Sequence, residues 1–468
     1  MFSRKAYTLV LATLATGLLL LAGCGGQGTG ATKVEGKLVD TCGQPISYKT
    51  IYVPGHDPVM TDAEGEFVIP DVQTPYDLVV ANAYLAPGVR DRADVSILVY
   101  KGLTTSEPLI WAKDLDKKPN DSCVSASASV ALKSSKTGTD YENGAALLLP
   151  PYMNGTTFAA DSSATISLKF DPDLAGEAPL FGIQWKKDPD TGDATAFVGA
   201  KSISVSLDDG SSIQKELELD EAGMGSRSMV VSVEAPAVMR VDGIGNYVSV
   251  DGTTLKIQTA QLDSSEAGED GTYSIVVPEA DGVGSTVFSS AEYGDARAIK
   301  EASALDISTT MGFVGVWQAV PATGHEMTVS FPEPLVPVAP LNGATIDPAS
   351  TTFSWSGHEG DVYEAIFDLH TTGPEVVVEV VTTEPQLQLP DLGGLGLTFD
   401  SLDQGEWFVI DFGGALSPGS VDDFTSREGF SLLAPIYMEE DGPFSAQADA
   451  YFMEVFGGEF TGPAGNAY

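Results

Sequence analysis

Residues 202–207, Ser-Ile-Ser-Val-Ser-Leu, alternate polar and apolar side chains. Successive side chains of an extended chain point to opposite faces, so this alternation predicts a strand with one buried side and one solvent-facing side. The pattern returns at 165–170 (Thr-Ile-Ser-Leu-Lys-Phe) and at 247–250 (Tyr-Val-Ser-Val). These stretches decide the fold class, because no long segment after residue 24 spaces its apolar residues as a helix does.

Turn signals separate the predicted strands at short intervals. They include Asp209-Gly210, Asp251-Gly252 and Asp270-Gly271, and the chain has 50 glycines and 28 prolines. Asp-Gly pairs favour the tight turns of antiparallel hairpins. We therefore predict an all-β protein of tandem immunoglobulin-like and transthyretin-like β-sandwich modules that follow a cleaved signal peptide.

The first 23 residues have the three parts of an export signal. Arg4 and Lys5 precede an apolar run from about Tyr7 to Leu21, which is shorter than the ~20 residues needed to span a bilayer. Leu21-Ala22-Gly23-Cys24 resembles the lipobox of bacterial lipoproteins. The resemblance implies cleavage before Cys24 and acylation of its thiol, so the lipid membrane is an expected partner. Residues 24–32 would form a glycine-rich tether.

The residue after the acylated cysteine bears on localisation. In enterobacterial sorting an aspartate there retains a lipoprotein at the inner membrane, whereas this chain has Gly25. We expect an outer-membrane lipoprotein that faces the periplasm or the cell surface.

The chain is strongly acidic, with 66 Asp and Glu against 24 Lys and Arg and a net charge of −42. Nucleic acid would be repelled, so it is not an expected partner. With 43% hydrophobic residues the chain is too apolar for wholesale disorder.

Two cysteines remain once Cys24 carries lipid. An even pair in an oxidising compartment favours a bridge, and we predict a disulfide between Cys42 and Cys123. The alternative is two separate buried thiols. If bridged, Cys123 would hold the start of the second module against the first.

The first module, residues 33–113, carries a specific family resemblance. Gly43 and Pro45 form a turn after the first strand, Thr61 to Gly65 form a hairpin turn, and Phe67 and Ile69 lie two apart so that both face the core. These residues, with Val34 to Asp40 and Ile51 to Val53, resemble the carboxypeptidase regulatory-like domain. The resemblance implies a seven-stranded sandwich, related to transthyretin and starch-binding modules, without the zinc ligands of the enzymes it accompanies.

The middle of the chain has a strand density that suggests two further sandwiches, at 124–225 and 226–331. A proline-rich stretch, residues 332–340, follows and predicts a stiff extended linker. The last module, 341–468, contains Thr352 to Trp355 and Gly405 to Val409, which resemble fibronectin type III-like repeats. The resemblance implies that Trp355 packs in the core and that Trp407 lies on a later strand. The module is long for such a repeat, so we expect an insertion or an extra hairpin after Leu416.

No recognised catalytic set appears in the sequence. The four histidines, His56, His325, His358 and His370, form no H-E-x-x-H and no pair at helical spacing, and no G-x-S-x-G is present. Each histidine is interpreted as a turn or surface residue.

One acidic loop is a candidate ligand site. Asp188, Asp190 and Asp193 alternate around Gly192, and closely spaced carboxylates on a loop are the beginning of a calcium site. The alternative is a polar hairpin turn, since Asp, Pro and Gly are the residues that turns use. The sequence predicts no cofactor apart from this candidate calcium ion.

Three functions stay open. The first is a membrane-anchored, non-enzymatic binding, structural or adhesion module of the cell envelope, whose partner is an unknown envelope protein or glycan. The second is a carbohydrate-binding accessory protein of a degradative system, which needs an exposed aromatic platform from among Tyr48, Tyr52, Tyr84 and Trp111. The third is an unrecognised hydrolase in the middle region, which needs two acids facing each other across a cleft.

Overall fold

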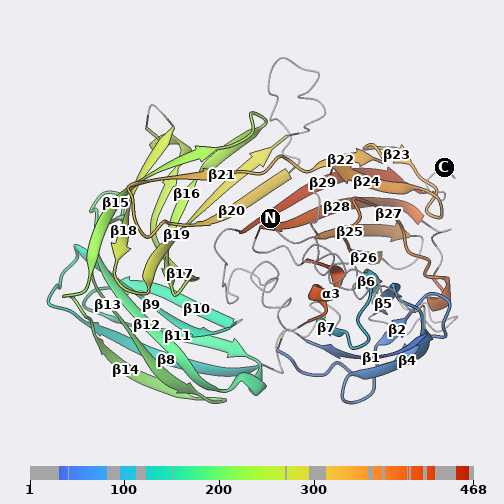
Figure 1. The fold of residues 1–468 in the computed structure, drawn as a ribbon, viewed down its shortest axis with the longest axis horizontal. Helices are drawn as coiled ribbons and strands as arrows, with labels where there is room; N and C mark the ends of the chain where they lie inside the picture. The colour runs from blue at the N-terminus through green and yellow to red at the C-terminus, as the bar shows by residue number, and fades with distance from the viewer. Residues whose placement is uncertain are drawn as a thin grey trace, which may run out of the picture.

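The computed structural model describes residues 31–40, 42–81, 95–111, 123–150, 152–268, 271–294, 312–356, 362–371, 375–397, 399, 402–414, 419–426 and 450–462. Within these residues the regular structure is almost entirely strand, and helix is confined to α3 (Val421–Phe424) and three short 3-10 turns. The predicted all-β class is confirmed. The strands form four β-sandwiches, called modules 1 to 4 in chain order (Figure 1).

Module 1 contains seven strands in two layers. One layer has the order β4-β1-β7 and the other β3-β2-β5-β6. Phe67 and Ile69 are both buried, as predicted, and Gly65 takes the positive φ of 73° that the preceding hairpin turn needs. The strands are β1 (Thr32–Val39), β2 (Thr50–Tyr52), β3 (Val59–Met60), β4 (Glu66–Val72), β5 (Tyr76–Ala81), β6 (Val95–Leu103) and β7 (Leu109–Trp111).

Module 2 repeats this two-layer arrangement, with the orders β11-β8-β14 and β10-β9-β12-β13. The predicted strand at 165–170 lies in β11, and its apolar side chains Ile166, Leu168 and Phe170 are all buried. The strands are β8 (Val124–Lys133), β9 (Tyr141–Leu149), β10 (Tyr152–Ala159), β11 (Ser163–Phe170), β12 (Gly176–Lys187), β13 (Ala194–Leu207) and β14 (Ser212–Glu218).

Module 3 begins with β15 at Gly225, and its layers have the orders β18-β15-β21 and β17-β16-β19-β20. Asp251 and Gly252 both have positive φ, 48° and 82°, in the tight turn between β16 and β17. The strands are β15 (Gly225–Glu234), β16 (Met239–Val250), β17 (Thr253–Asp263), β18 (Thr272–Glu279), β19 (Val283–Tyr293), β20 (Gly312–Ala319) and β21 (Glu326–Ser330).

Module 4 packs the layer β22-β24-β27 on the layer β26-β25-β28-β29. Trp355 and Trp407 are buried between the layers with ring centroids 6.4 Å apart. The segment after Leu416 supplies α3 and the long strand β29. The strands are β22 (Val336–Ala339), β23 (Ala344–Thr345), β24 (Thr352–Ser356), β25 (Val362–Thr371), β26 (Glu375–Thr382), β27 (Gln386–Gln388), β28 (Leu402–Gly414) and β29 (Ala450–Thr461).

The proline-rich stretch 332–340 is not a free linker along its whole length. Its residues Val336–Ala339 form β22, which pairs antiparallel with β24. Proline is tolerated here because β22 is the edge strand of its sheet, where one side of the backbone needs no partner.

One sheet of 13 strands runs through modules 3, 4 and 1. Module 3 joins module 4 where β20 pairs antiparallel with β29, from Gly312↔Val455 to Trp317↔Ala450. Module 4 joins module 1 where β26 pairs parallel with β6, from Val376↔Val95 to Val381↔Tyr100. The modules are therefore connected by backbone hydrogen bonds as well as by side-chain packing.

The shared sheet is buried on both faces at β6. Leu98 and Tyr100 pack into the core of module 1, whereas Ile97 and Val99 face the core that includes module 4. This double burial explains why Val95 to Tyr100 is almost continuously apolar instead of alternating.

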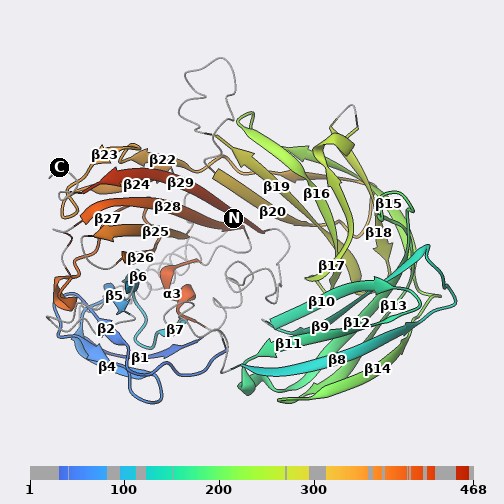
Figure 2. The same cartoon turned by 180° about the vertical axis from the view of Figure 1, so that it is seen from behind.

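Further contacts close the four modules into a ring (Figures 1 and 2). Modules 2 and 3 meet across an apolar cluster that contains Trp185, Phe197 and Ile257. The helix α3 brings Val421 and Phe424 from module 4 into the core of module 1. Modules 1 and 2 are joined by a disulfide.

The predicted signal peptide, Cys24 and the glycine-rich tether to residue 30 lie outside the described residues. In the part of the chain that the structure describes, no helix has the length and apolar character needed to cross a membrane.

Candidate functional site

The junction of modules 1 and 2 contains the predicted disulfide. Cys42 lies in the turn after β1, Cys123 lies directly before β8, and their Cα atoms are 5.1 Å apart, within the usual range for a bridged pair. The Asp40 carboxylate accepts hydrogen bonds from the backbone N–H groups of Cys42 (2.8 Å) and Gln44 (2.9 Å), which fixes the turn. This arrangement supports the predicted disulfide over two separate thiols.

Gly43 is required at this junction for two reasons. Its φ of 73° lies in the left-handed region, and a Cβ at this position would overlap the carboxylate of Asp171 in module 2. Asp171 is itself buried and accepts a hydrogen bond of 2.9 Å from the N–H of Asp173. The two modules are in direct contact here, so the disulfide joins surfaces that already fit together.

The candidate calcium loop forms a hairpin turn between β12 and β13. The Asp188 carboxylate accepts hydrogen bonds from the N–H groups of Asp190 (2.8 Å) and Thr191 (3.2 Å), and Gly192 has a φ of 86°. Asp193 accepts from the N–H of Gln261 in module 3 at 3.1 Å. The structure therefore does not gather the three carboxylates around one point, and two of them stabilise backbone.

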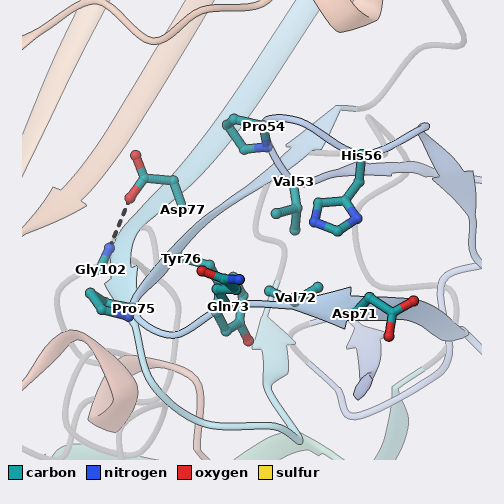
Figure 3. Close-up of a pocket in the computed structure, with 10 residues that line it drawn as sticks. All are labelled: Val53, Pro54, His56, Asp71, Val72, Gln73, Pro75, Tyr76, Asp77 and Gly102. Atoms are coloured by element: carbon teal, nitrogen blue, oxygen red, sulfur yellow. Dashed lines mark hydrogen bonds between the residues drawn. The ribbon is translucent and has the colours of Figure 1, made fainter. Parts of the chain in front are cut away.

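A pocket of about 490 Å³ opens at one end of module 1 (Figure 3). Its walls are the loop after β2, the connection between β4 and β5, and β6. The residues that line it are Val53, Pro54, His56, Asp71, Val72, Gln73, Pro75, Tyr76, Asp77 and Gly102.

Two of the polar groups at this pocket hold the module together. Asp77 accepts a hydrogen bond of 3.0 Å from the N–H of Gly102, and the Tyr76 hydroxyl donates to the carbonyl of Thr105 at 2.7 Å. Burial, reinforced by the nearby negative charge of Asp422, raises the pKa of Tyr76 above its ordinary value. Tyr76 therefore stays neutral at physiological pH and acts as a structural hydrogen-bond donor.

His56, Asp71 and Gln73 are the remaining polar side chains of the pocket, and Figure 3 shows them around Val72. Asp71 has a φ of 57°, which is uncommon for a residue with a Cβ and marks a constrained point near the end of β4, where its register with β1 shifts. Imidazole, carboxylate and amide groups can together bind a small polar ligand through hydrogen bonds. This set has no signal in the sequence, because only the fold brings the loop after β2 next to the end of β4 and the connection that follows it.

Among the described residues, the aromatic side chains proposed for sugar stacking do not form a platform. Tyr48 is 68% exposed, Tyr52 is buried in the core, and Tyr84 lies outside the described residues. Trp111 packs partly on the core of module 2, and its indole N–H donates to the carbonyl of Ser426 at 3.2 Å. One exposed ring is left near module 1 from this set.

Comparison with known proteins gives no family assignment. No protein-family model matches the chain, and no curated protein matches it. Among solved structures, the Bacillus anthracis TIE protein is similar at 8% identity over 64% of this chain and 50% of its own length, with a TM-score of 0.16. A Streptococcal ancillary pilin is similar at 11% identity over 64% of this chain and 98% of its own, with a TM-score of 0.14.

A putative adhesin from Bacteroides ovatus is similar at 8% identity over 47% of this chain and 84% of its own, with a TM-score of 0.15. At such TM-scores the superpositions carry no functional argument, and the all-β fold rests on the sheets described above.

Proposed function

We propose that this protein is a lipid-anchored, non-enzymatic scaffold or adhesion protein of the cell envelope, which holds a rigid set of β-sandwiches close to a membrane. Its partner would be an envelope protein or a glycan. The proposed anchor is the acylated Cys24, and Gly25 supports the outer membrane as its location.

The continuous 13-stranded sheet carries this proposal. Modules joined only by linkers move relative to one another as a default. Here, relative movement of modules 3, 4 and 1 would have to break the ladders β20–β29 and β26–β6. Such a body suits a protein that displays loops in a fixed orientation.

The acidic surface fits the same role. The full chain has a net charge of −42, and cleavage before Cys24 would remove the two positive charges of Arg4 and Lys5. This excess of acids would keep the anchored protein soluble and repel anionic lipid headgroups. The module loops, including the pocket of module 1, would therefore stay accessible to a partner.

The test combines fractionation with protease treatment of intact cells. Wild-type protein should remain with the outer membrane, and the Cys24→Ala variant should lose this association. Recovery of both proteins in the same membrane fraction would refute the lipid anchor. Protection of the anchored protein from external protease would restrict its partners to the periplasm.

A glycan array probed with the full chain in detergent distinguishes a glycan partner from a protein partner. Saturable binding of one glycan class, weakened by a substitution at the module 1 pocket such as His56→Ala, would favour the carbohydrate-binding alternative. If no glycan on the array binds, the partner would be an envelope protein, which crosslinking in intact cells would identify.

A further inference from the structure

Three potential metal ligands meet at the end of the hairpin formed by β25 and β26. His370 in β25 is paired directly with Glu375 in β26, and Asp368 lies two residues before His370. Residues two apart on a strand share a face, and directly opposed residues of an antiparallel pair do so as well. The ladder therefore places all three side chains on one face of the sheet.

The three side chains approach one another closely. One ligand atom from each of Asp368, His370 and Glu375 lies within 4.8 Å of the other two. The separation between His370 Nε2 and Asp368 Oδ1 is 4.0 Å. The Asp368 and His370 side chains are 35% and 41% exposed, so an ion can enter from solvent.

Asp368 Oδ1 provides a second, independent observation. This oxygen is fully buried although the rest of its side chain is not, and no hydrogen-bond donor satisfies it among the described residues. A buried carboxylate oxygen without a partner is unfavourable, because it has lost its water and gained nothing in return. A bound cation would supply the missing interaction.

Two further acidic residues lie near these three side chains. Glu406 in β28 is paired with Asp368, and Glu459 in β29 is paired with Glu406, so the same row continues with two more acids. In the described part of the chain, no lysine or arginine forms an ion pair with any of these acids. Like charges so arranged on a sheet repel unless a cation lies between them.

We propose that Asp368, His370 and Glu375 form a binding site for a divalent transition-metal ion of the zinc class. One imidazole nitrogen and two carboxylate oxygens suit Zn²⁺, with water as a fourth ligand. Calcium fits poorly, because it takes six to eight oxygen ligands and no nitrogen.

The geometry is compatible with tetrahedral coordination. Bonds of about 2.0–2.2 Å place neighbouring ligand atoms about 3.3 Å apart. The three side chains would have to draw together by roughly 1 Å, which rotation of half-exposed side chains permits without movement of the backbone.

This site is independent of the proposed scaffold function and can be tested alone. The full chain in detergent would be titrated with Co²⁺, as a spectroscopic substitute for Zn²⁺, in excess Ca²⁺ that occupies oxygen-only surface sites. We expect one Co²⁺ site with the visible absorption of low coordination number, from which Zn²⁺ displaces Co²⁺.

The decisive variants are His370→Ala, Asp368→Asn and Glu375→Gln. Each should weaken Co²⁺ binding at least about tenfold. His325→Ala is the matched control, since His325 is a second histidine beside a glutamate but binds the carbonyl of Ser228 at 3.0 Å through its ring. It should bind Co²⁺ as the wild type does.

Two results would overturn the proposal. One is a wild-type chain that shows no Co²⁺ absorption under these conditions. The other is unchanged affinity in the variants. If His370→Ala reduces folding by circular dichroism, the nearly isosteric Asp368→Asn and Glu375→Gln still decide the question, because they remove charge but keep the imidazole.

Discussion

Removal of the Cys42–Cys123 disulfide is expected to loosen the junction between modules 1 and 2. The bonded cysteines are 81 residues apart in the chain, and the loop-closure entropy for that length corresponds to about 4.5 kcal/mol at 25 °C. Other contacts at this junction include that of Gly43 with Asp171 and that of Trp111 with the core of module 2. From its loop length alone, the disulfide should contribute several kcal/mol to the stability of this junction.

Hydrogen exchange of backbone amides measures this effect strand by strand. In the double variant Cys42→Ala/Cys123→Ala, the opening free energies of β1 and β8 should fall by up to about 4.5 kcal/mol. Amides of β25 should keep their protection, because β25 lies in module 4 whereas the bond joins modules 1 and 2. Reduction of the wild-type protein should reproduce the loss, and the same reductant should leave the double variant unchanged.

Two outcomes would refute this reasoning. A loss below about 1 kcal/mol in both β1 and β8 would show that packing alone holds the junction. An equal loss in β25 would show that the bond stabilises the whole ring instead of one junction.

Three further expectations concern single side chains. Gly43→Ala should lower the free energy of thermal unfolding by about 2–3 kcal/mol. Gly55→Ala, at a similar φ of 88° but in open space, should lower it only by the backbone strain of about 1–2 kcal/mol. Equal losses in the two variants would contradict the close approach of Gly43 to Asp171. Trp407→Ala should lower the free energy of unfolding in urea by about 3–5 kcal/mol, because the ring is fully buried, while Val338→Ala, which is 53% exposed, should change it by no more than about 0.5 kcal/mol. Burial raises the pKa of Tyr76, so the phenol of the unfolded chain loses its proton at a lower pH than that of the folded chain. The protonated phenol therefore stabilises the fold fully below pH about 10, and this stabilisation is lost as the pH rises further. In Tyr76→Phe, the free energy of unfolding in urea should fall less steeply at alkaline pH, by a slope that corresponds to about one proton, and an unchanged slope would contradict the assignment.

The strands of the outer sheets could be predicted from the sequence because their signal is local. In residues 202–207 the three serines are exposed, Val205 and Leu207 are buried, and Ile203 lies between these extremes. Alternation of this kind depends only on which side of a pleated chain faces water. The turns are local in the same sense, as the positive φ angles at Asp251 and Gly252 show.

The pairing of strands between modules was not predicted, and the reason is physical. Nothing in the composition of the valine-rich strand β26 specifies β6 as its neighbour, about 280 residues earlier. Backbone hydrogen bonds are the same for every residue type, so pairing between distant strands is decided by packing on both faces. The proline-rich stretch was interpreted as a linker for a related reason, since an edge strand and an extended spacer share one backbone conformation.

The sequence by itself determined the all-β class and many strand and turn positions, because each depends on neighbouring residues. The export signal and its lipobox stay predictions from a short motif. Only the tertiary structure decided that a 13-stranded sheet runs through three of the four sandwiches and helps to close them into one ring. It alone placed His370 opposite Glu375, and His56 and Asp71 in one pocket. Strand register and loop convergence create such sites, and both are set by packing across elements, which no spacing along the chain records.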